Sequence, residues 1–84
     1  MRSLSSLPNI GRITEALLND AGIETAEDLL RLGSREAFLR LRLKDETLCL
    51  RMLYGLEGAV QGIQDTRLSP DVKEELKAFF NSLS

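Results

Sequence analysis

The chain has 84 residues, which fits one domain and leaves no room for two. Its hydrophobic fraction of 43% is enough for a small core, and its net charge of −2 argues against strong, non-specific binding of nucleic acid. The composition excludes histidine catalysis, a disulfide within the chain and a zinc site, because there is no histidine and only one cysteine, Cys49. We therefore expect neither an enzyme nor a protein that holds a cofactor or a metal.

Cysteine usage and hydropathy also indicate the compartment. A chain with a single thiol is typical of proteins that stay in the reducing cytoplasm. The first residues contain no apolar stretch long enough for a signal peptide, and no apolar run approaches the roughly 18 residues of a membrane span. We expect a cytoplasmic protein that does not contact a membrane.

The spacing of apolar residues predicts an all-α domain. Residues 1–6 are expected to be a flexible N-terminal lead-in, and residues 7–82 the folded domain. Apolar residues recur at helical spacing in five segments, and nowhere do they alternate long enough for a strand. The predicted helices cover residues 12–21, 26–32, 35–43, 46 to 61 or 63, and 70–80. The long fourth helix is apolar over the widest arc, so we expect it at the centre of a compact five-helix fold.

Capping residues support these boundaries. Side-chain oxygens can accept a hydrogen bond from the first turn of four helices, at Thr25, Ser34, Asp45 and Ser69. The apolar faces of the five helices are expected to meet in one core that contains Leu17, Leu30, Phe38, Leu53, Leu56, Ala59 and Phe79. Cys49 falls on the apolar arc of the fourth helix, where a small core residue is expected.

The fourth helix contains an unusual run of glycines, "LYGLEGAVQG". Each glycine inside a helix costs about 0.5–1 kcal/mol relative to alanine, so a close contact should offset the loss. Gly55, Gly58, Ala59 and Gly62 are expected to let another helix approach within the domain, or to form a surface for self-association or for a partner. Glu57 between them is expected in solvent, or bonded to Arg51 or Tyr54 if it is buried.

The stretch "LPNIG" before the first helix has the pattern of a tight hairpin. Asn9 tolerates a positive φ, and the turn delivers backbone N–H groups to a helix start, where they have no partner within the helix. Such a site is electropositive and suits a phosphate. Candidate contacts to a phosphate backbone are Asn9, Gly11, Arg12, Ile13 and Thr14. The other interpretation is that this stretch is only a turn and helix start in a packed domain.

The middle of the chain carries an excess of positive charge. Arg35, Arg40, Arg42 and Lys44 form a candidate basic patch for a phosphate backbone or an acidic partner. The other interpretation is a solvated face of a helix.

Four stretches taken together carry a family resemblance. In order, "LPNIG", "LLNDAGI", "TAEDLLRLGSREAFLRLR" and "LYGLEGAVQGI" resemble the C-terminal domain of the TfoX/Sxy family from about Leu7 to Phe80. The resemblance implies a SAM-like five-helix fold with a helix-hairpin-helix-like element, and a bacterial regulator linked to natural competence and to transcription. The "PNIG" hairpin is also similar to one in the C-terminal domain of the RNA polymerase α subunit, which binds DNA backbone and proteins.

Two functions follow as hypotheses. The first is a non-enzymatic regulatory module linked to competence and transcription, with weak, sequence-independent contact to DNA backbone or with a regulatory protein partner. The second is a module for protein interaction or self-association that does not bind DNA.

Overall fold

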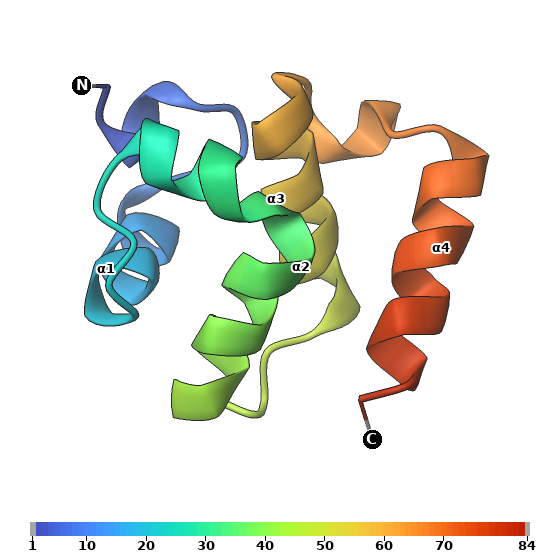
Figure 1. The fold of residues 1–84 in the computed structure, drawn as a ribbon. Helices are drawn as coiled ribbons and strands as arrows, with labels where there is room; N and C mark the ends of the chain where they lie inside the picture. Colours follow the sequence, from blue (N-terminus) through green and yellow to red (C-terminus); the bar gives the residue numbers. More distant parts are fainter. Residues whose placement is uncertain (1, 84) are drawn as a thin grey trace.

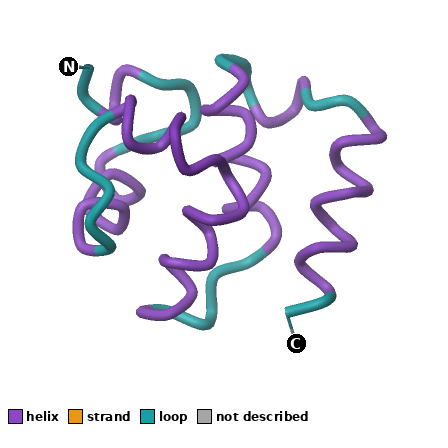
Figure 2. Tube along the Cα trace, in the orientation of Figure 1, coloured by secondary structure: helices purple, strands orange, loops and turns teal. Residues whose placement is uncertain are grey.

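The computed structural model describes residues 2–83, whose regular secondary structure is entirely helical. The helices are α1 (Arg12–Asp20), α2 (Ala26–Lys44), α3 (Leu50–Gln61) and α4 (Pro70–Asn81), with single 3₁₀ turns η1 (Leu4–Ser6) and η2 (Asp65–Arg67) (Figure 1). α2 is two helical segments joined at Gly33, whose φ of 83° interrupts the helix. The all-α fold of five helices is therefore confirmed. Within residues 2–83 there is no strand, only an isolated bridge between Ser3 and Thr25 (Figure 2).

The helix α3 is the centre of the fold. It packs against α2, α4 and η2, whereas α1 packs against α2 and η1. Figure 1 shows α1 and α4 on opposite sides of the pair formed by α2 and α3. Leu53 and Leu56 of α3 are buried with Phe38 and Leu41 of α2, so the core lies chiefly between these two helices.

The core differs from the predicted one by a rotation of two helices. Phe38, Leu53, Leu56 and Ala59 are buried as predicted, but Leu30 is 38% exposed. Leu17 and Phe79 are only partly buried and lie at the edge of the core. The neighbouring Leu18 and Leu29 are fully buried in their place. One residue turns a helix by about 100°, so a small error in phase exchanges the buried residue for its neighbour.

The start of α3 was predicted four residues too early. The carboxylate of Asp45 accepts hydrogen bonds from the backbone N–H of Thr47 at 3.0 Å and from its hydroxyl. Asp45 is the C-cap of α2, and its side chain closes a local turn instead of capping the start of α3, because such a turn competes with helix formation. Cys49 is the N-cap of α3 and is exposed, so the prediction of a core cysteine is wrong.

The other predicted caps have mixed outcomes. Thr25 and Ser69 cap α2 and α4 by accepting from the N–H groups of Asp28 and Val72, at 3.1 and 3.2 Å. The hydroxyl of Ser34 is buried and donates instead to the carboxylate of Glu57 at 2.5 Å. Gln61 donates to the same carboxylate at 2.7 Å, so the partners of Glu57 are not the predicted ones.

The segment before the hairpin has fixed contacts where the sequence predicted a flexible lead-in. Leu4 is fully buried. The backbone N–H of Arg2 donates to Glu27 at 3.0 Å, and the carbonyl of Arg2 accepts from Ala26 at 3.0 Å. Residue 1 of the expected lead-in lies outside the described residues.

No helix within residues 2–83 combines the length and apolar character that crossing a bilayer requires.

Candidate functional site

The hairpin "LPNIG" brings the chain onto α3 before α1 begins. Asn9 adopts a φ of 68°, the left-handed conformation that the sequence predicted for it. Gly11 is the N-cap of α1 and keeps an extended backbone, with φ −95° and ψ −171°. Leu7 and Ile10 are buried on either side of the turn and anchor it to the core.

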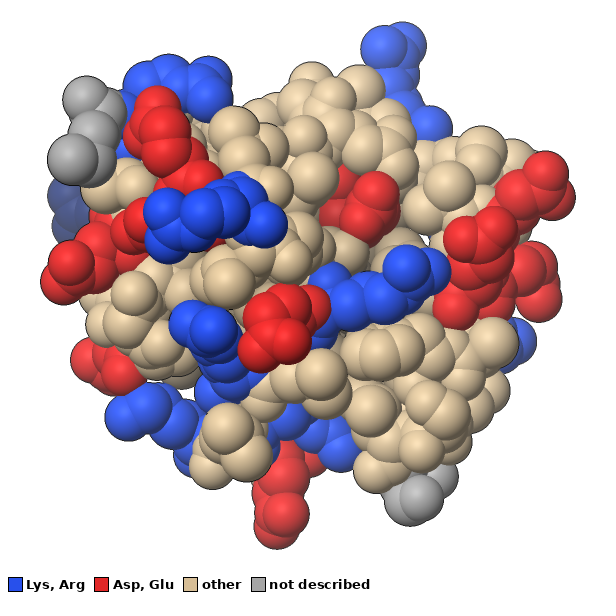
Figure 3. All heavy atoms as spheres, viewed as in Figure 1, with Lys and Arg blue, Asp and Glu red and all other residues tan. Residues whose placement is uncertain are grey.

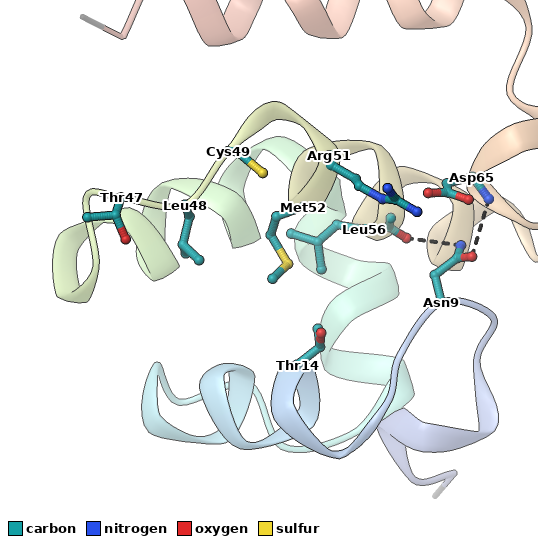
Figure 4. A pocket seen from close by; sticks show the side chains of 10 residues that line it. Asn9, Thr14, Thr47, Leu48, Cys49, Arg51, Met52, Leu56 and Asp65 are labelled. Carbon is teal, nitrogen blue, oxygen red and sulfur yellow. Dashed lines mark hydrogen bonds between the residues drawn. The ribbon is translucent and has the colours of Figure 1, made fainter.

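The side chain of Asn9 fastens this hairpin to the end of α3. Its amide nitrogen donates to the carbonyl of Gly55 at 3.2 Å, and its amide oxygen accepts from the N–H of Asp65 at 3.2 Å (Figure 4). The amide nitrogen also donates to the carbonyl of Ile63 at 3.0 Å. Both amide hydrogens are therefore used inside the fold. Asn9 positions the hairpin, and a phosphate would have to be met by Gly11, Arg12, Ile13 and Thr14.

The glycines of α3 make room for that side chain. A Cβ on Gly58 would lie 2.5 Å from the amide nitrogen of Asn9 and 2.8 Å from the carbonyl oxygen of Ile63. Gly55 is more open, with Asn9 Cβ at 3.7 Å. The close approach is therefore made by the hairpin and the segment after α3, not by another helix. Ala59 lies in the core, and Gly62 ends α3 with a φ of 78°.

The first turn of α1 is left open toward solvent. The carbonyl of Gly11 accepts from Glu15 at 2.9 Å, but no side chain of the described residues caps the helix. Arg12 is exposed, Ile13 is 79% exposed and Thr14 is half-buried. The N–H groups at this end carry partial positive charge, which suits an anion.

A groove runs beside this helix start. Figure 4 shows Thr14 of α1 on one side and side chains of α3 and the preceding loop on the other. The groove has a volume of about 530 Å³ and is lined by Asn9, Thr14, Thr47, Leu48, Cys49, Arg51, Met52, Gly55, Leu56 and Asp65. Its floor is apolar, and its charged groups are Arg51 and Asp65.

The predicted basic patch is not brought to the hairpin as a unit. The guanidinium of Arg35 lies over the ring of Phe79 and 3.7 Å from the carboxylate of Glu75, both on α4. Arg40 pairs with Glu36 of its own helix at 3.2 Å, and Lys44 is exposed at the end of α2.

Arg42 is held still more firmly on the same side. It lies over the rings of Phe38 and Phe80, 5.7 and 5.5 Å from their centroids, and donates to the carbonyl of Leu48 at 3.2 Å. Arg35 and Arg42 thus face α4, on the far side of the molecule from α1 (Figure 1). On the face shown in Figure 3, basic side chains are scattered among acidic ones instead of forming one field.

Sequence reasoning missed Arg51. It is exposed and lies one turn before Gly55 and two turns before Gly58, on the face of α3 that receives the hairpin. In Figure 4 its side chain extends toward Asp65 and Asn9. The spacing of four and seven residues to the two glycines was the signal that could have found it.

Three carboxyl groups of residues 2–83 have a lowered pKa, in each case chiefly because of hydrogen bonds to the carboxylate. The pKa of Glu27 is lowered by its own backbone N–H and then by that of Arg2. The N–H of Glu24 lowers the pKa of Asp28, and the hydroxyl and N–H of Thr47 lower the pKa of Asp45. All three fix turns or helix starts. Within residues 2–83, no group of three His, Cys, Asp or Glu side chains could hold a metal ion.

Comparison with known proteins identifies the family. The family model described as "TfoX C-terminal domain" matches residues 1–80. Protein Sxy of Escherichia coli (strain K12) is 35% identical over 81 residues, which are 96% of this chain but 39% of Sxy. The chain thus spans about two fifths of this curated relative.

Two solved structures from Listeria monocytogenes share the fold. One, in a triclinic crystal form, is called an uncharacterized protein: it is 51% identical, with a TM-score of 0.95 over 96% of this chain and 92% of that one. The other, in a tetragonal form, is called a protein of unknown function: it is 51% identical, with a TM-score of 0.94 over 96% and 99% of the two chains. By the match of the family model over nearly its whole length, the chain belongs to the TfoX C-terminal domain family.

Proposed function

We propose that this domain is a non-enzymatic regulatory module of a cytoplasmic, competence-related regulator that acts on transcription. Membership of the TfoX C-terminal domain family and the relationship to Sxy support this role. The working surface of the module is the hairpin and the start of α1.

The observation that carries the proposal is the open first turn of α1 behind a hairpin that is fixed in place. Asn9 holds the hairpin with three hydrogen bonds, so the N–H groups that follow it are presented by a rigid support. Arg12 adds a charge and Thr14 a hydroxyl, both groups that commonly contact DNA phosphates. Because such contacts do not read bases, the domain would bind duplex DNA without sequence preference.

Binding at this surface is expected to be weak. The chain is acidic overall, and residues of the predicted basic patch face α4. An affinity in or below the non-specific range of about 10⁻⁴–10⁻⁶ M is expected. Such an interaction suits a module that acts together with another DNA-bound protein.

Titration of a short fluorescent duplex at about 50 and about 200 mM salt tests this function. Arg12→Glu should weaken binding to every duplex, and affinity should fall as salt rises. Lys77→Glu is the matched control, because Lys77 is exposed on α4 and its substitution makes the same change in net charge. An affinity that does not depend on salt, or that is the same in wild type and Arg12→Glu, would count against DNA binding.

A second function is favoured by one feature of the same surface. Ile13 is 79% exposed, and its neighbour Thr14 lines a groove that contains Leu48, Met52 and Leu56. Exposed apolar groups of this kind are typical of protein interfaces. If the domain acts by self-association, sedimentation velocity should show a concentration-dependent dimer that Ile13→Lys abolishes. If the domain is a monomer at all concentrations, self-association is excluded, and binding to another protein is the remaining form of this second function.

A further inference from the structure

The structure separates the cations of this chain into two groups. Those of the first group have partners: Arg2, Arg31, Arg35 and Arg40 form ion pairs, and Arg42 lies over two phenylalanine rings. Among residues 2–83, no carboxylate forms an ion pair with the remaining cations, which are Arg12, Lys44, Arg51, Arg67, Lys73 and Lys77. An unpaired cation is free to pair with a partner of opposite charge.

Three of these unpaired cations, Arg51, Arg67 and Lys73, line hollows beside the hairpin or next to that of Arg51, although they come from three different elements. Arg51 of α3 lines the groove beside Asn9 and also an adjoining hollow of about 390 Å³, which it shares with Lys73 of α4. Arg67 of η2 lines a third hollow together with Pro8, on the hairpin itself.

The fold holds these positions firmly. Arg51 stands one turn before Gly55, whose carbonyl accepts from Asn9. The hydroxyl of Tyr54 donates to the backbone carbonyl of Lys73 at 3.4 Å and ties α4 to α3 at this point. The hydrogen bond from Asp65 to Asn9 fixes η2, which carries Arg67, against the hairpin.

We propose that Arg51, across the groove from the start of α1, forms a second contact to the phosphate backbone of duplex DNA together with Lys73 in the adjoining hollow, with Arg67 at the edge. This inference rests on the proposed DNA-linked function and replaces the basic patch that the sequence predicted at residues 35–44. Thr66 lies in the hollow between Arg51 and Lys73 and adds a hydroxyl donor.

A nucleic-acid backbone fits this surface better than an acidic peptide. A duplex offers a continuous row of charges, which cations spread over α3, η2 and α4 can reach together. A single acidic side chain would satisfy one cation and leave the others unused. Asp65 lines the hollows of Arg51 and Lys73 and offsets part of their charge, which agrees with the weak binding expected for this domain.

The test compares two double variants in the duplex titration. Arg51→Glu/Lys73→Glu removes the proposed contact. Arg40→Glu/Lys44→Glu makes the same change in net charge at exposed positions of α2 that line none of these hollows. Arg51→Glu/Lys73→Glu should weaken binding about tenfold or more. It should also lower the slope of log affinity against log salt by about 2, because each of the two cations neutralises one phosphate. Arg40→Glu/Lys44→Glu should stay within about twofold of wild type, because its charges lie away from the DNA.

The possible outcomes separate this inference from the proposed function. If both double variants weaken binding equally, only net charge matters and the site is refuted. If Arg12→Glu weakens binding but Arg51→Glu/Lys73→Glu does not, the inference fails while DNA binding by the hairpin stands. A wild type that binds no duplex at low salt would overturn both. The site would also be overturned if oligoglutamate bound more tightly than duplex and no longer bound to Arg51→Glu/Lys73→Glu. Circular dichroism and thermal melting of each variant confirm the fold.

Discussion

The amide of Asn9 rests directly on Gly58, 49 positions later in the chain. No side chain fits between the two residues, since a Cβ on Gly58 would approach the amide nitrogen to 2.5 Å. The glycine thus admits Asn9, and Asn9 in turn holds the hairpin that presents the start of α1. Both the conformation of the candidate site and the stability of the fold therefore depend on this contact.

Two alanine substitutions on α3 should have opposite effects. Gly58→Ala should lower the free energy of unfolding by about 1–3 kcal/mol, because its Cβ would meet both Asn9 and the backbone of Ile63. Gly55→Ala should raise it by roughly 0.5–1 kcal/mol, because its nearest neighbour is at an ordinary 3.7 Å and alanine favours the helix. Urea denaturation of both variants measures the difference. Equal effects at the two positions would show that the hairpin does not pack on Gly58.

Substitution of Asn9 separates its hydrogen bonds from its backbone conformation. Asn9→Gly keeps the positive φ but removes three hydrogen bonds, and should destabilise by about 1–3 kcal/mol. Asn9→Ala should lose about 1–2 kcal/mol more, because a Cβ disfavours a φ of 68°. Chemical denaturation provides both values. If the two variants are equally stable, the left-handed conformation does not persist in solution.

The sequence predicted the hairpin and its residues but not what they touch. A positive φ at Asn9 and a close contact at the α3 glycines follow from local chemistry. Their meeting joins residues about 50 positions apart and depends on how the helices pack. The predicted basic patch is divided for a related reason. Arg35 and Arg42 are seven residues apart, so they share one face of the helix. That face contacts the aromatic rings of α4.

Arg42 should matter for stability, whereas Arg40 should not. Arg42→Ala removes the packing on Phe38 and Phe80 and the hydrogen bond to Leu48, and should destabilise by about 1–2 kcal/mol. Arg40→Ala removes only an exposed ion pair with Glu36 and should change stability by less than about 0.5 kcal/mol. Thermal melting compares the two. Equal shifts in Tm would mean that Arg42 is an ordinary surface residue.

Stability should fall in acid, partly through Glu27. Hydrogen bonds to its carboxylate hold the pKa of Glu27 below its ordinary value of 4.5 in the folded state, so the unfolded chain binds more protons. The resulting stabilisation is present above pH 4.5 and is lost as the pH falls through the folded pKa. Denaturation between neutral and acid pH should show a steeper loss in wild type than in Glu27→Gln. The same slope in both proteins would show that this carboxyl is not perturbed.

Titration of the ¹⁵N-labelled domain with a short duplex shows whether DNA contacts the start of α1. The backbone amide signals of Gly11, Arg12, Ile13 and Thr14 should shift together, and the side-chain signal of Arg51 should shift with them. Signals from residues 39–44 of α2 should stay in place and serve as the internal control. Shifts confined to other surfaces, or no shifts at low salt, would show that the start of α1 is not a DNA contact.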